Sequence, residues 1–372
     1  MLDILIIAGN ARSLIANRGD LIQDLKSRGL SVAAAVPSAD YLSEVESLGI
    51  PIYQFDMGRT GMNPVHDFKT ILSLRKLIKS CKPKAVFGYN IKPVIYGSFA
   101  AKSAGVPRIY SMITGLGHVF SGEGGTKKHV RFIASLLYRS ALFFNRKVFF
   151  QNPDDIQEFK QRNILTDPKK VVRVYGSGVN MEQYPPSKLP EGNVTFLYIG
   201  RLLYEKGINE FCEAAALVKA ANPHARFVAV GPHDPTLPHS CSNSDLERWK
   251  SVGAVEFIGG VSDVRPWLEQ GTVFVFPSYY REGTPRCVLE AMSMGRPIIT
   301  TDSPGCRETV IRGENGILVP PRDSKAVAAA MQRFVDEPLL AEQMGKASIR
   351  FVEEYYDVRK VNRVIMDAME LV

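Results

Sequence analysis

Short apolar runs alternate with longer amphipathic stretches along the chain. The run LDILIIA is followed by the helical stretch LIQDLKSRG, and the next apolar run, SVAAAVP, by DYLSEVESLG. The alternation continues through KAVFGYN, RIYSMIT and KVFFQN, with a helical stretch after each run. The runs are uniformly apolar, which is typical of strands covered on both faces by helices. The pattern therefore predicts an α/β fold built on parallel sheets.

The alternation stops once and then restarts. Three prolines lie close together in GVNMEQYPPSKLPEGN, so residues 185–193 are predicted to form a linker. Beyond it, NVTFLYIG, ARFVAVG, VEFIG, TVFVFPS and RPIITTD supply a second set of strands. The sequence thus predicts two tandem Rossmann-like βαβ domains, residues 1–184 and 194–350, with an interdomain cleft where strand ends face one another. Residues 351–372 are expected to form a C-terminal helix that packs back toward the first domain.

Positive charge is concentrated in the first half. Residues 1–185 hold 25 Lys and Arg against 14 Asp and Glu, a net +11, whereas residues 186–372 hold 21 against 24, a net −3. This asymmetry indicates an anionic partner: nucleic acid, an acidic membrane surface or a phosphorylated substrate. The five cysteines include no CxxC pair, which favours reduced thiols and a cytoplasmic location. No apolar run reaches the roughly eighteen residues that span a bilayer.

Two glutamates stand eight positions apart in REGTPRCVLEAMSMGRPIITTD. This stretch follows the predicted strand TVFVFPS, so Glu282 lies at the carboxyl end of a strand, where open α/β sheets bind ligands. Thr284 is expected to cap the next helix and Pro285 to open it, with Glu290 inside it. The amides at the helix start would face an anion or a hydroxyl. The alternative is that both carboxylates are ordinary surface groups.

A second cluster of charge follows the first strand of the second domain, in YIGRLLYEKGINEF. Arg201 and Lys206 can converge on one point, and Gly207 leads into a helix N-terminus. Two cations beside helix-end amides are suited to a diphosphate. The alternative is that both are solvated surface charges.

Two turns mark strand ends in the first domain. The turn AGNARS, Gly9–Ser13, is predicted either to bind phosphate or to be a simple connection. In TGLGHVF, Gly115 and Gly117 bracket Leu116 and place His118 at the same sheet edge. A histidine there can bond a sugar hydroxyl or transfer a proton, although a structural role is the alternative.

Metal and cofactor motifs are absent from the sequence. There is no Asp-x-Asp and no His, Cys and carboxylate cluster at metal-ligand spacing. There is also no GxGxxG fingerprint, GxxxxGK[ST] loop or GxSxG elbow. We therefore expect neither a metal nor a bound cofactor.

The order of these motifs resembles a known family. Two tandem βα domains, GR followed by KG, and EG-x-P-x4-E resemble glycosyltransferase family 4, retaining nucleotide-sugar enzymes of the GT-B architecture. The stretches NIKPVIYGSFAAKSAGVP, ITGLGHVF, VFFQNPDD and REGTPRCVLEAMSMGRPIITTDSPGCRETV are similar to the bacterial branch that adds N-acetylhexosamines, such as N-acetylgalactosamine, to undecaprenyl-diphosphate-linked saccharides. The first turn, AGNARS, departs from the family because it lacks the frequent double glycine.

The resemblance implies roles for individual residues. Glu290 would hold the ribose hydroxyls, and Arg201 with Lys206 the donor diphosphate, while Glu282 and the amides after it would hold the donor sugar. His118 would face the transferred sugar, and it joins Glu282, Arg201 and Lys206 as the expected catalytic set. The remaining donor-side residues would be Gly9, Gly283, Thr284, Pro285 and Arg286, and the acceptor-side residues Asn10, Gly115, Leu116 and Gly117.

The segment TKKHVRFIASLLYRSALFFNRK is predicted to form a basic helix. Its cations are expected to share one helical face, with Phe132, Leu136 and Phe143 turned away from it. Such a helix could rest on anionic lipid headgroups, or could instead pack its apolar side on the sheet. The expected membrane contacts are Lys127, Lys128, Arg131 and Arg139.

Taken together, the residues and the resemblance imply a retaining transferase. The expected donor is a UDP-sugar and the expected acceptor a polyprenyl-diphosphate-linked saccharide, so the enzyme would work at the inner face of the cell membrane. A nucleotide-sugar epimerase of the same architecture is one alternative. A two-lobed protein that binds anions or nucleic acid is another, although the basic residues lack an interleaved aromatic platform.

Overall fold

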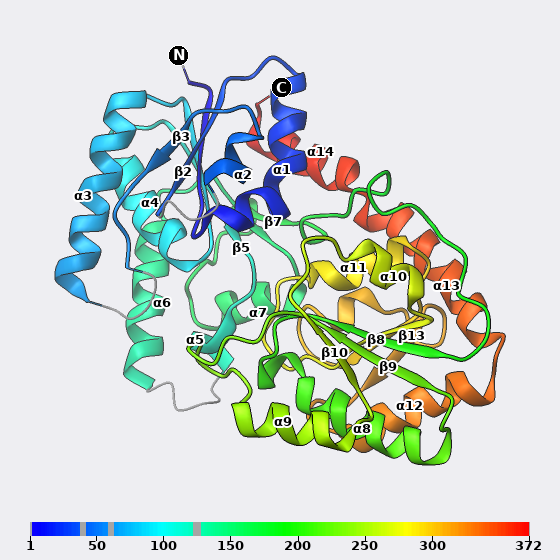
Figure 1. Cartoon of the computed structure of the whole chain (residues 1–372). Helices are drawn as coiled ribbons and strands as arrows, with labels where there is room; N and C mark the ends of the chain where they lie inside the picture. The colour runs from blue at the N-terminus through cyan, green and yellow to red at the C-terminus, as the bar shows by residue number, and fades with distance from the viewer. Residues whose placement is uncertain (1, 38–41, 59–62, 122–127, 372) are drawn as a thin grey trace. The chain divides into compact units, whose positions relative to one another are not determined.

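The computed structural model describes residues 2–37, 42–58, 63–121 and 128–371, with only the backbone of Leu42, His118 and Ser121. It contains two compact units. Unit 1 comprises Met1–Ser177 with Val358–Val372, and unit 2 comprises Gly178–Asp357. Each unit is a parallel sheet covered by helices, which confirms the α/β prediction (Figure 1).

Unit 1 is built on a parallel sheet of order β3-β2-β1-β4-β5-β6-β7 within the described residues. The four residues of β1, ILII, are all buried, as are the five of β2, VAAAV, and of β4, AVFGY. These strands contain no charged residue, because helices cover both of their faces. The strands are β1 (Ile4–Ile7), β2 (Val32–Val36), β3 (Ile52–Gln54), β4 (Ala85–Tyr89), β5 (Arg108–Ile113), β6 (Lys147–Phe150) and β7 (Val171–Arg173).

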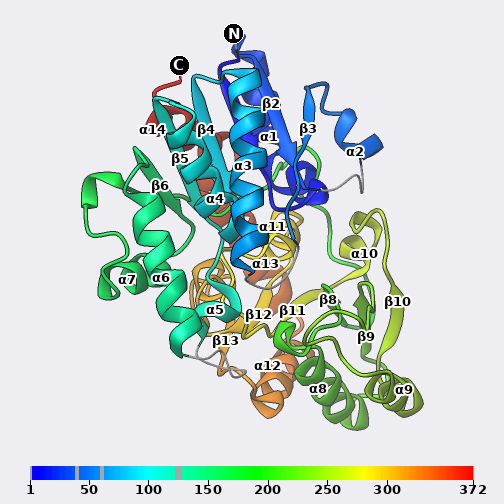
Figure 2. The same cartoon turned by 90° about the vertical axis from the view of Figure 1, so that its left-hand side faces the viewer.

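Helices cover the two faces of this sheet with separate apolar cores. On one face α3 packs on α4 and α4 on α6, which lie side by side in Figure 2. On the other face, α1 packs against α2 and α14. The helices of unit 1 are α1 (Ala11–Ser27), α2 (Leu42–Glu46), α3 (Pro64–Cys81), α4 (Ile91–Ser103), α5 (Gly117–Ser121), α6 (Lys128–Leu142), α7 (Pro153–Gln161) and α14 (Val358–Met369).

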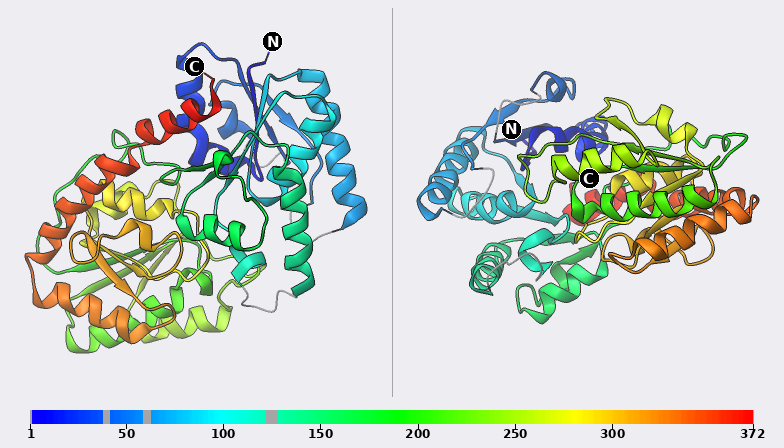
Figure 3. Two further views of the ribbon diagram at one scale, coloured as in Figure 1. Left: turned by 180° about the vertical axis from the view of Figure 1, so that it is seen from behind. Right: turned by 60° about the horizontal axis from the view of Figure 1, so that its bottom comes forward.

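The last helix, α14, belongs to unit 1 although it is far from the rest of that unit in sequence. Its apolar face, which includes Val361, Ile365 and Met366, is buried in the core that α1 shares. The Asn362 amide donates to Asp24 on α1 at 2.7 Å, and the Tyr110 hydroxyl donates to the Met369 carbonyl at 2.7 Å. Figure 3 shows α14 beside α1 from behind.

Unit 2 repeats the plan with a sheet of order β10-β9-β8-β11-β12-β13. Helix α12 packs along α8, and α11 along α13. The strands are β8 (Thr195–Ile199), β9 (Arg226–Val230), β10 (Glu256–Gly259), β11 (Val273–Phe276), β12 (Ile298–Thr301) and β13 (Gly316–Val319). The helices are α8 (Ile208–Ala221), α9 (Asn243–Val252), α10 (Arg265–Gln270), α11 (Arg286–Ser293), α12 (Ser324–Asp336) and α13 (Leu340–Phe351), which continues into a π-helical turn, Val352–Tyr356.

The unit boundary differs from the expected linker. The chain divides between Ser177 and Gly178, and the proline-rich segment 185–193 lies within unit 2. The reason is Arg296, a fully buried arginine whose guanidinium donates to the carbonyls of Ser187 at 3.4 Å and Lys188 at 3.2 Å. These hydrogen bonds hold segment 185–193 against the rest of unit 2. The C-terminal division also lies later than expected, since unit 2 runs to Asp357.

Candidate functional site

The turn after β8 is fixed against the segment that follows β11. A 3-10 turn, Tyr204–Lys206, leads into Gly207, which has φ 81°. A Cβ at Gly207 would lie 2.2 Å from the Pro277 carbonyl oxygen, so this close approach requires glycine. The Glu205 carbonyl accepts the N–H groups of Tyr279 and Tyr280, each at 3.0 Å. The two strand ends are therefore held together by backbone contacts.

This packing brings Lys206 against Glu282. The Lys206 ammonium contacts Oε1 of Glu282, and the Ser278 hydroxyl lies 3.1 Å from the same oxygen. Only 13% of the Lys206 side chain and 12% of the Glu282 side chain are exposed. The ammonium also lies 4.9 Å from the centre of the Tyr280 ring. A partly desolvated ion pair thus stands at the carboxyl edge of the sheet, where the sequence predicts each of the two residues to lie.

Arg201 follows β8 in the same turn as Lys206. Its backbone carbonyl accepts the Tyr198 hydroxyl at 3.1 Å, while its side chain is exposed. Burial raises the pKa of Tyr280, the carboxylates of Glu282 and Glu205 add to that effect, and the charge of Arg201 opposes it. Lys206 therefore lies against the Tyr280 ring, and the charge of Arg201 also lowers the pKa of Tyr280.

Glu290 lies on α11 and is buried. The Arg286 guanidinium donates to its Oε1 at 2.7 Å, one helical turn earlier. Burial raises the pKa of Glu290, and the charge and hydrogen bond of Arg286 and a hydrogen bond from Tyr184 act against this shift. Burial, together with the Glu290 charge, raises the pKa of Tyr184 to about 12. The two glutamates of the motif thus each have their own cation, so the motif forms two ion pairs.

The start of α11 differs from the prediction. The helix begins at Arg286, and Pro285 occupies the N-cap position without a side-chain cap. Thr284 therefore lies one position before the N-cap. The turn before it packs closely on another segment, because a Cβ at Gly305 would lie 2.5 Å from the Gly283 carbonyl oxygen and 2.6 Å from that of Glu282. This packing fixes the backbone that the family resemblance assigns to the donor sugar.

In unit 1, the predicted turns gather at one edge of the sheet. Strands β1, β4 and β5 are neighbours in parallel register, so Gly9 and Gly115, which follow β1 and β5, share an edge. Asn10 is already engaged there, because its side-chain oxygen caps α1 by accepting the Ser13 N–H at 2.8 Å. Leu116 is 1% exposed and belongs to the core, so only its backbone faces the edge. The acceptor-side roles of Asn10, Gly115, Leu116 and Gly117 stay predictions.

Two predicted residues lie beyond what the structure describes. His118 is on α5, but its side chain is outside the described atoms, and Lys127 falls in the undescribed segment 122–127. Their roles stay predictions.

The basic helix α6 differs from its predicted arrangement. Phe132 is 70% exposed, Leu136 54% and Phe143 75%, so these side chains do not pack on the sheet. Phe132 and Leu136 line the same groove as the basic residues, rather than turning away from them, because residues three and four apart lie on one face of a helix. The buried side of α6 is instead formed by Ala134, Tyr138, Ala141 and Leu142.

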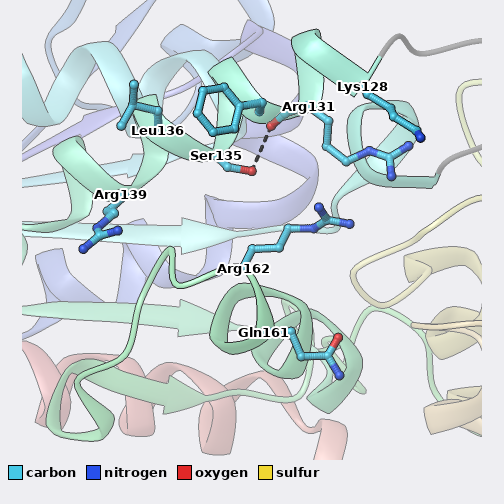
Figure 4. Close-up of a pocket in the computed structure, with 8 residues that line it drawn as sticks. Lys128, Arg131, Ser135, Leu136, Arg139, Gln161 and Arg162 are labelled. Carbon is cyan, nitrogen blue, oxygen red and sulfur yellow. Dashed lines mark hydrogen bonds between the residues drawn. The ribbon is translucent and has the colours of Figure 1, made fainter.

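This groove has a volume of about 620 Å³ and lies along α6 and the end of α7 (Figure 4). Among the described residues no carboxylate lines it. Arg162 contributes from the position directly after α7 and is paired with Glu158, which lies outside the lining. The cations of α6 that line the groove are Lys128, Arg131 and Arg139. An apolar and cationic lining of this kind suits an amphipathic anion such as a lipid headgroup.

Sequence reasoning missed three polar side chains of unit 2. Ser278 and Tyr280 contact the Lys206–Glu282 pair, and Tyr184 bonds Glu290. Ser278 and Tyr280 stand in PSYY, directly after the apolar run VFVF, so their place at a strand end was the available signal. Tyr184 directly precedes the segment predicted to be a linker, residues 185–193, and no motif marked it.

Comparison with known proteins matches both units to glycosyltransferase families. Residues 4–152 match the family described as glycosyl transferase 4-like, and residues 193–337 match glycosyl transferases group 1. No helix in the described part of the chain is both long and apolar enough to cross a bilayer.

Individual relatives extend over most of the chain. An N,N'-diacetylbacillosaminyl-diphospho-undecaprenol alpha-1,3-N-acetylgalactosaminyltransferase of Campylobacter jejuni is 27% identical, covering 91% of this chain and 90% of its own. A UDP-Gal:alpha-D-GlcNAc-diphosphoundecaprenol alpha-1,3-galactosyltransferase of Escherichia coli is 26% identical, covering 88% and 85%. The crystal structure of Anabaena HepE in complex with UDP-glucose matches with a TM-score of 0.80 at 16% identity and covers all of both chains. This chain is thus a glycosyltransferase whose two Rossmann-like units belong to the 4-like and group 1 families.

Proposed function

We propose that the chain transfers a sugar from a UDP-sugar to an undecaprenyl-diphosphate-linked saccharide in cell-surface glycan or glycoprotein oligosaccharide assembly. Two relatives that match 91% and 88% of the chain are named for transfer to sugars on this lipid. One of them is named for N-acetylgalactosamine and the other for UDP-galactose. An N-acetylhexosamine is the donor sugar we favour, because the first of these relatives is the more similar.

The observation that supports this proposal most strongly is the presence of two ion pairs in unit 2. Lys206 with Glu282, and Arg286 with Glu290, stand at the strand end and the following helix of the same unit. A buried carboxylate such as Glu290 can accept two ribose hydroxyls, since a carboxylate has several acceptor positions. Lys206 and Arg201 supply positive charge for a diphosphate. A nucleotide-sugar carries both groups, the ribose hydroxyls of its nucleoside and the diphosphate that joins the nucleoside to the sugar.

The proposed chemistry depends on stabilising the leaving group. As the bond between sugar and diphosphate breaks, negative charge develops on the phosphate, and Arg201 and Lys206 would stabilise it by fixed electrostatics. In this scheme the two cations do the work that a metal ion does in other transferases, so we propose that no metal is required. Retention would arise by attack from the face of the leaving group, with the departing phosphate oxygen taking the proton of the acceptor hydroxyl.

The groove along α6 supports a peripheral position on the inner face of the membrane. Phe132 and Leu136 would enter the headgroup region, while Lys128, Arg131 and Arg139 would pair with lipid phosphates. Exposed aromatic and basic side chains on one helical face provide both contributions that interfacial binding needs. This position would bring unit 1 to a lipid-linked acceptor.

The experiment that tests the proposal measures release of nucleoside diphosphate from a panel of UDP- and GDP-sugars. Each donor is incubated with synthetic polyprenyl-diphosphate monosaccharides, with soluble sugars, or with no acceptor. Release of UDP that requires the lipid-linked saccharide supports the proposal, and the anomeric configuration of the product by NMR tests retention. Donor conversion that is independent of any acceptor would contradict it and would favour an epimerase.

A further inference from the structure

Asn90 has a backbone conformation that a residue with a side chain rarely adopts. It follows β4 and precedes α4, with φ 70° and ψ 158°. This region of conformational space is open almost only to glycine, and residues held in it gather at functional sites. Asparagine before a helix normally accepts an N–H of the first turn, but Asn90 makes no such cap. Its strained conformation therefore does not serve the helix.

The side chain of Asn90 carries a second unfavourable feature. Its Nδ2 donates to the Thr114 hydroxyl at 3.1 Å, whereas its Oδ1 is buried and has no hydrogen-bond partner among the described residues. A buried acceptor without a partner destabilises the folded state. Asn90 thus combines a strained backbone with a buried oxygen that has no hydrogen-bond partner among the described residues. Both features destabilise the fold, so stability alone does not explain an asparagine at this position.

The surroundings of Asn90 show what its side chain holds together. Thr114 follows β5, and Gly9 follows β1, with β4 lying between these two strands. The Asn90 oxygen would lie 3.0 Å from a Cβ built on Gly9, so the carboxamide is packed against that turn. One side chain therefore bridges the turns after β1 and β5. The second of these turns leads directly into Gly115, Leu116, Gly117 and His118.

We infer that Asn90 is a positioning residue, whose strained backbone aims the carboxamide so that the Gly9 and Thr114 turns are held for the acceptor saccharide. This inference rests on the proposed function, because it assigns the edge of the unit 1 sheet to the acceptor. Asn90 acts through the two turns rather than by contacting the reacting atoms.

Asn90→Gly is the informative variant, because glycine adopts this backbone conformation without strain and removes the unsatisfied oxygen. We expect a melting temperature equal to or above that of the wild type, together with at least a tenfold loss of kcat/KM. The loss should appear in the KM for the lipid-linked acceptor, while the KM for the nucleotide-sugar stays unchanged. Thr114→Val should show the same defect, and the double variant should be no worse than Asn90→Gly.

Asn163→Gly is the matched control. Asn163 also has a positive φ, 53°, but lies exposed in the turn after α7. Its replacement should leave activity unchanged and the melting temperature equal or higher.

Three results would count against the inference or its basis, and each is distinct. An Asn90→Gly variant that is as active as the wild type would overturn the inference. A variant that loses both activity and melting temperature would also overturn it. Absence of transfer by the wild type in the same assay would instead remove the proposed function on which it rests.

Discussion

The ammonium group of Lys206, on the turn after β8, contacts the carboxylate of Glu282, which lies 76 residues later in the chain after β11. Backbone hydrogen bonds from Tyr279 and Tyr280 to the Glu205 carbonyl bring these segments together. The pair is largely shielded from solvent, so its electrostatic interaction is stronger than that of a surface pair. Its location at a strand end makes it the centre of the proposed donor site.

Replacing Lys206 by alanine is expected to lower kcat about a hundredfold, the effect of removing one electrostatic group that stabilises a developing negative charge. The free energy of unfolding should also fall by about 1–3 kcal/mol, because Glu282 loses a charged partner in a partly buried place. Steady-state kinetics and urea denaturation measure the two effects. Lys250→Ala is the control, since Lys250 pairs with Glu247 at the surface, where side chains are 49% and 70% exposed. A Lys206 variant that behaves like this control would argue against the assignment.

Glu290→Gln should bind UDP at least tenfold more weakly, because it loses a charged hydrogen-bond acceptor. The variant should nevertheless be no less stable than the wild type at neutral pH. Burial raises the pKa of Glu290 above its ordinary value of 4.5, so the folded chain keeps this proton to higher pH than the unfolded chain does. The stability contributed by protonated Glu290 is complete below pH 4.5 and is lost as pH rises through the folded pKa. Glutamine removes this dependence.

The melting temperature of Glu290→Gln relative to the wild type should therefore rise between pH 4.5 and pH 7.5. Thermal denaturation of both proteins across this range tests the sign. A relative melting temperature that falls with pH would mean that Glu290 is stabilised as a carboxylate, contrary to the effect of its burial.

Phe132→Ser should weaken binding to anionic vesicles about tenfold, an estimate from burial of one aromatic side chain. Its melting temperature should not change, since the side chain is 70% exposed. Sedimentation with vesicles of phosphatidylglycerol or phosphatidylcholine, at two salt concentrations, measures the apolar and ionic contributions separately. Leu339→Ser, at a leucine of unit 2 that is 69% exposed, is the matched control. Equal binding by both variants would rule out α6 as the contact.

Arg296→Met is expected to lower the free energy of unfolding by about 3 kcal/mol, because it removes a charged donor from one buried and two partly buried carbonyls. The guanidinium bonds Leu268 at 2.8 Å as well as Ser187 and Lys188. Proteolysis should become faster within 185–193, and denaturation in guanidinium chloride measures the stability change. Unchanged protection of this segment would show that other contacts hold it.

The fold was largely predictable because its signal is local. Buried strands such as ILII and VAAAV are apolar throughout, so their identity does not depend on distant residues. The linker prediction failed for the opposite reason. Prolines 185, 186 and 190 are locally typical of a linker, but Arg296, more than a hundred positions later, fixes this segment to unit 2.

Individual residues of the site could be predicted from the sequence, but the contacts between them could not. Lys206 and Glu282 were recognised separately, whereas their contact depends on how two strand ends pack. The start of α11 was misplaced because Thr284 and Pro285 fit a cap and a first turn equally well by residue type. Asn90 could not be found from sequence, since nothing in NIKP indicates a φ of 70°.

The most direct test of the account is the mass of the lipid product. The purified chain and its Lys206→Ala variant are each incubated with UDP-N-acetylhexosamines and an undecaprenyl-diphosphate-linked monosaccharide, and the lipids are analysed by mass spectrometry. The account predicts a product heavier by one N-acetylhexosamine with the wild type, and a strongly reduced amount with the variant. An unchanged lipid mass with every donor, or equal product from both proteins, would contradict it.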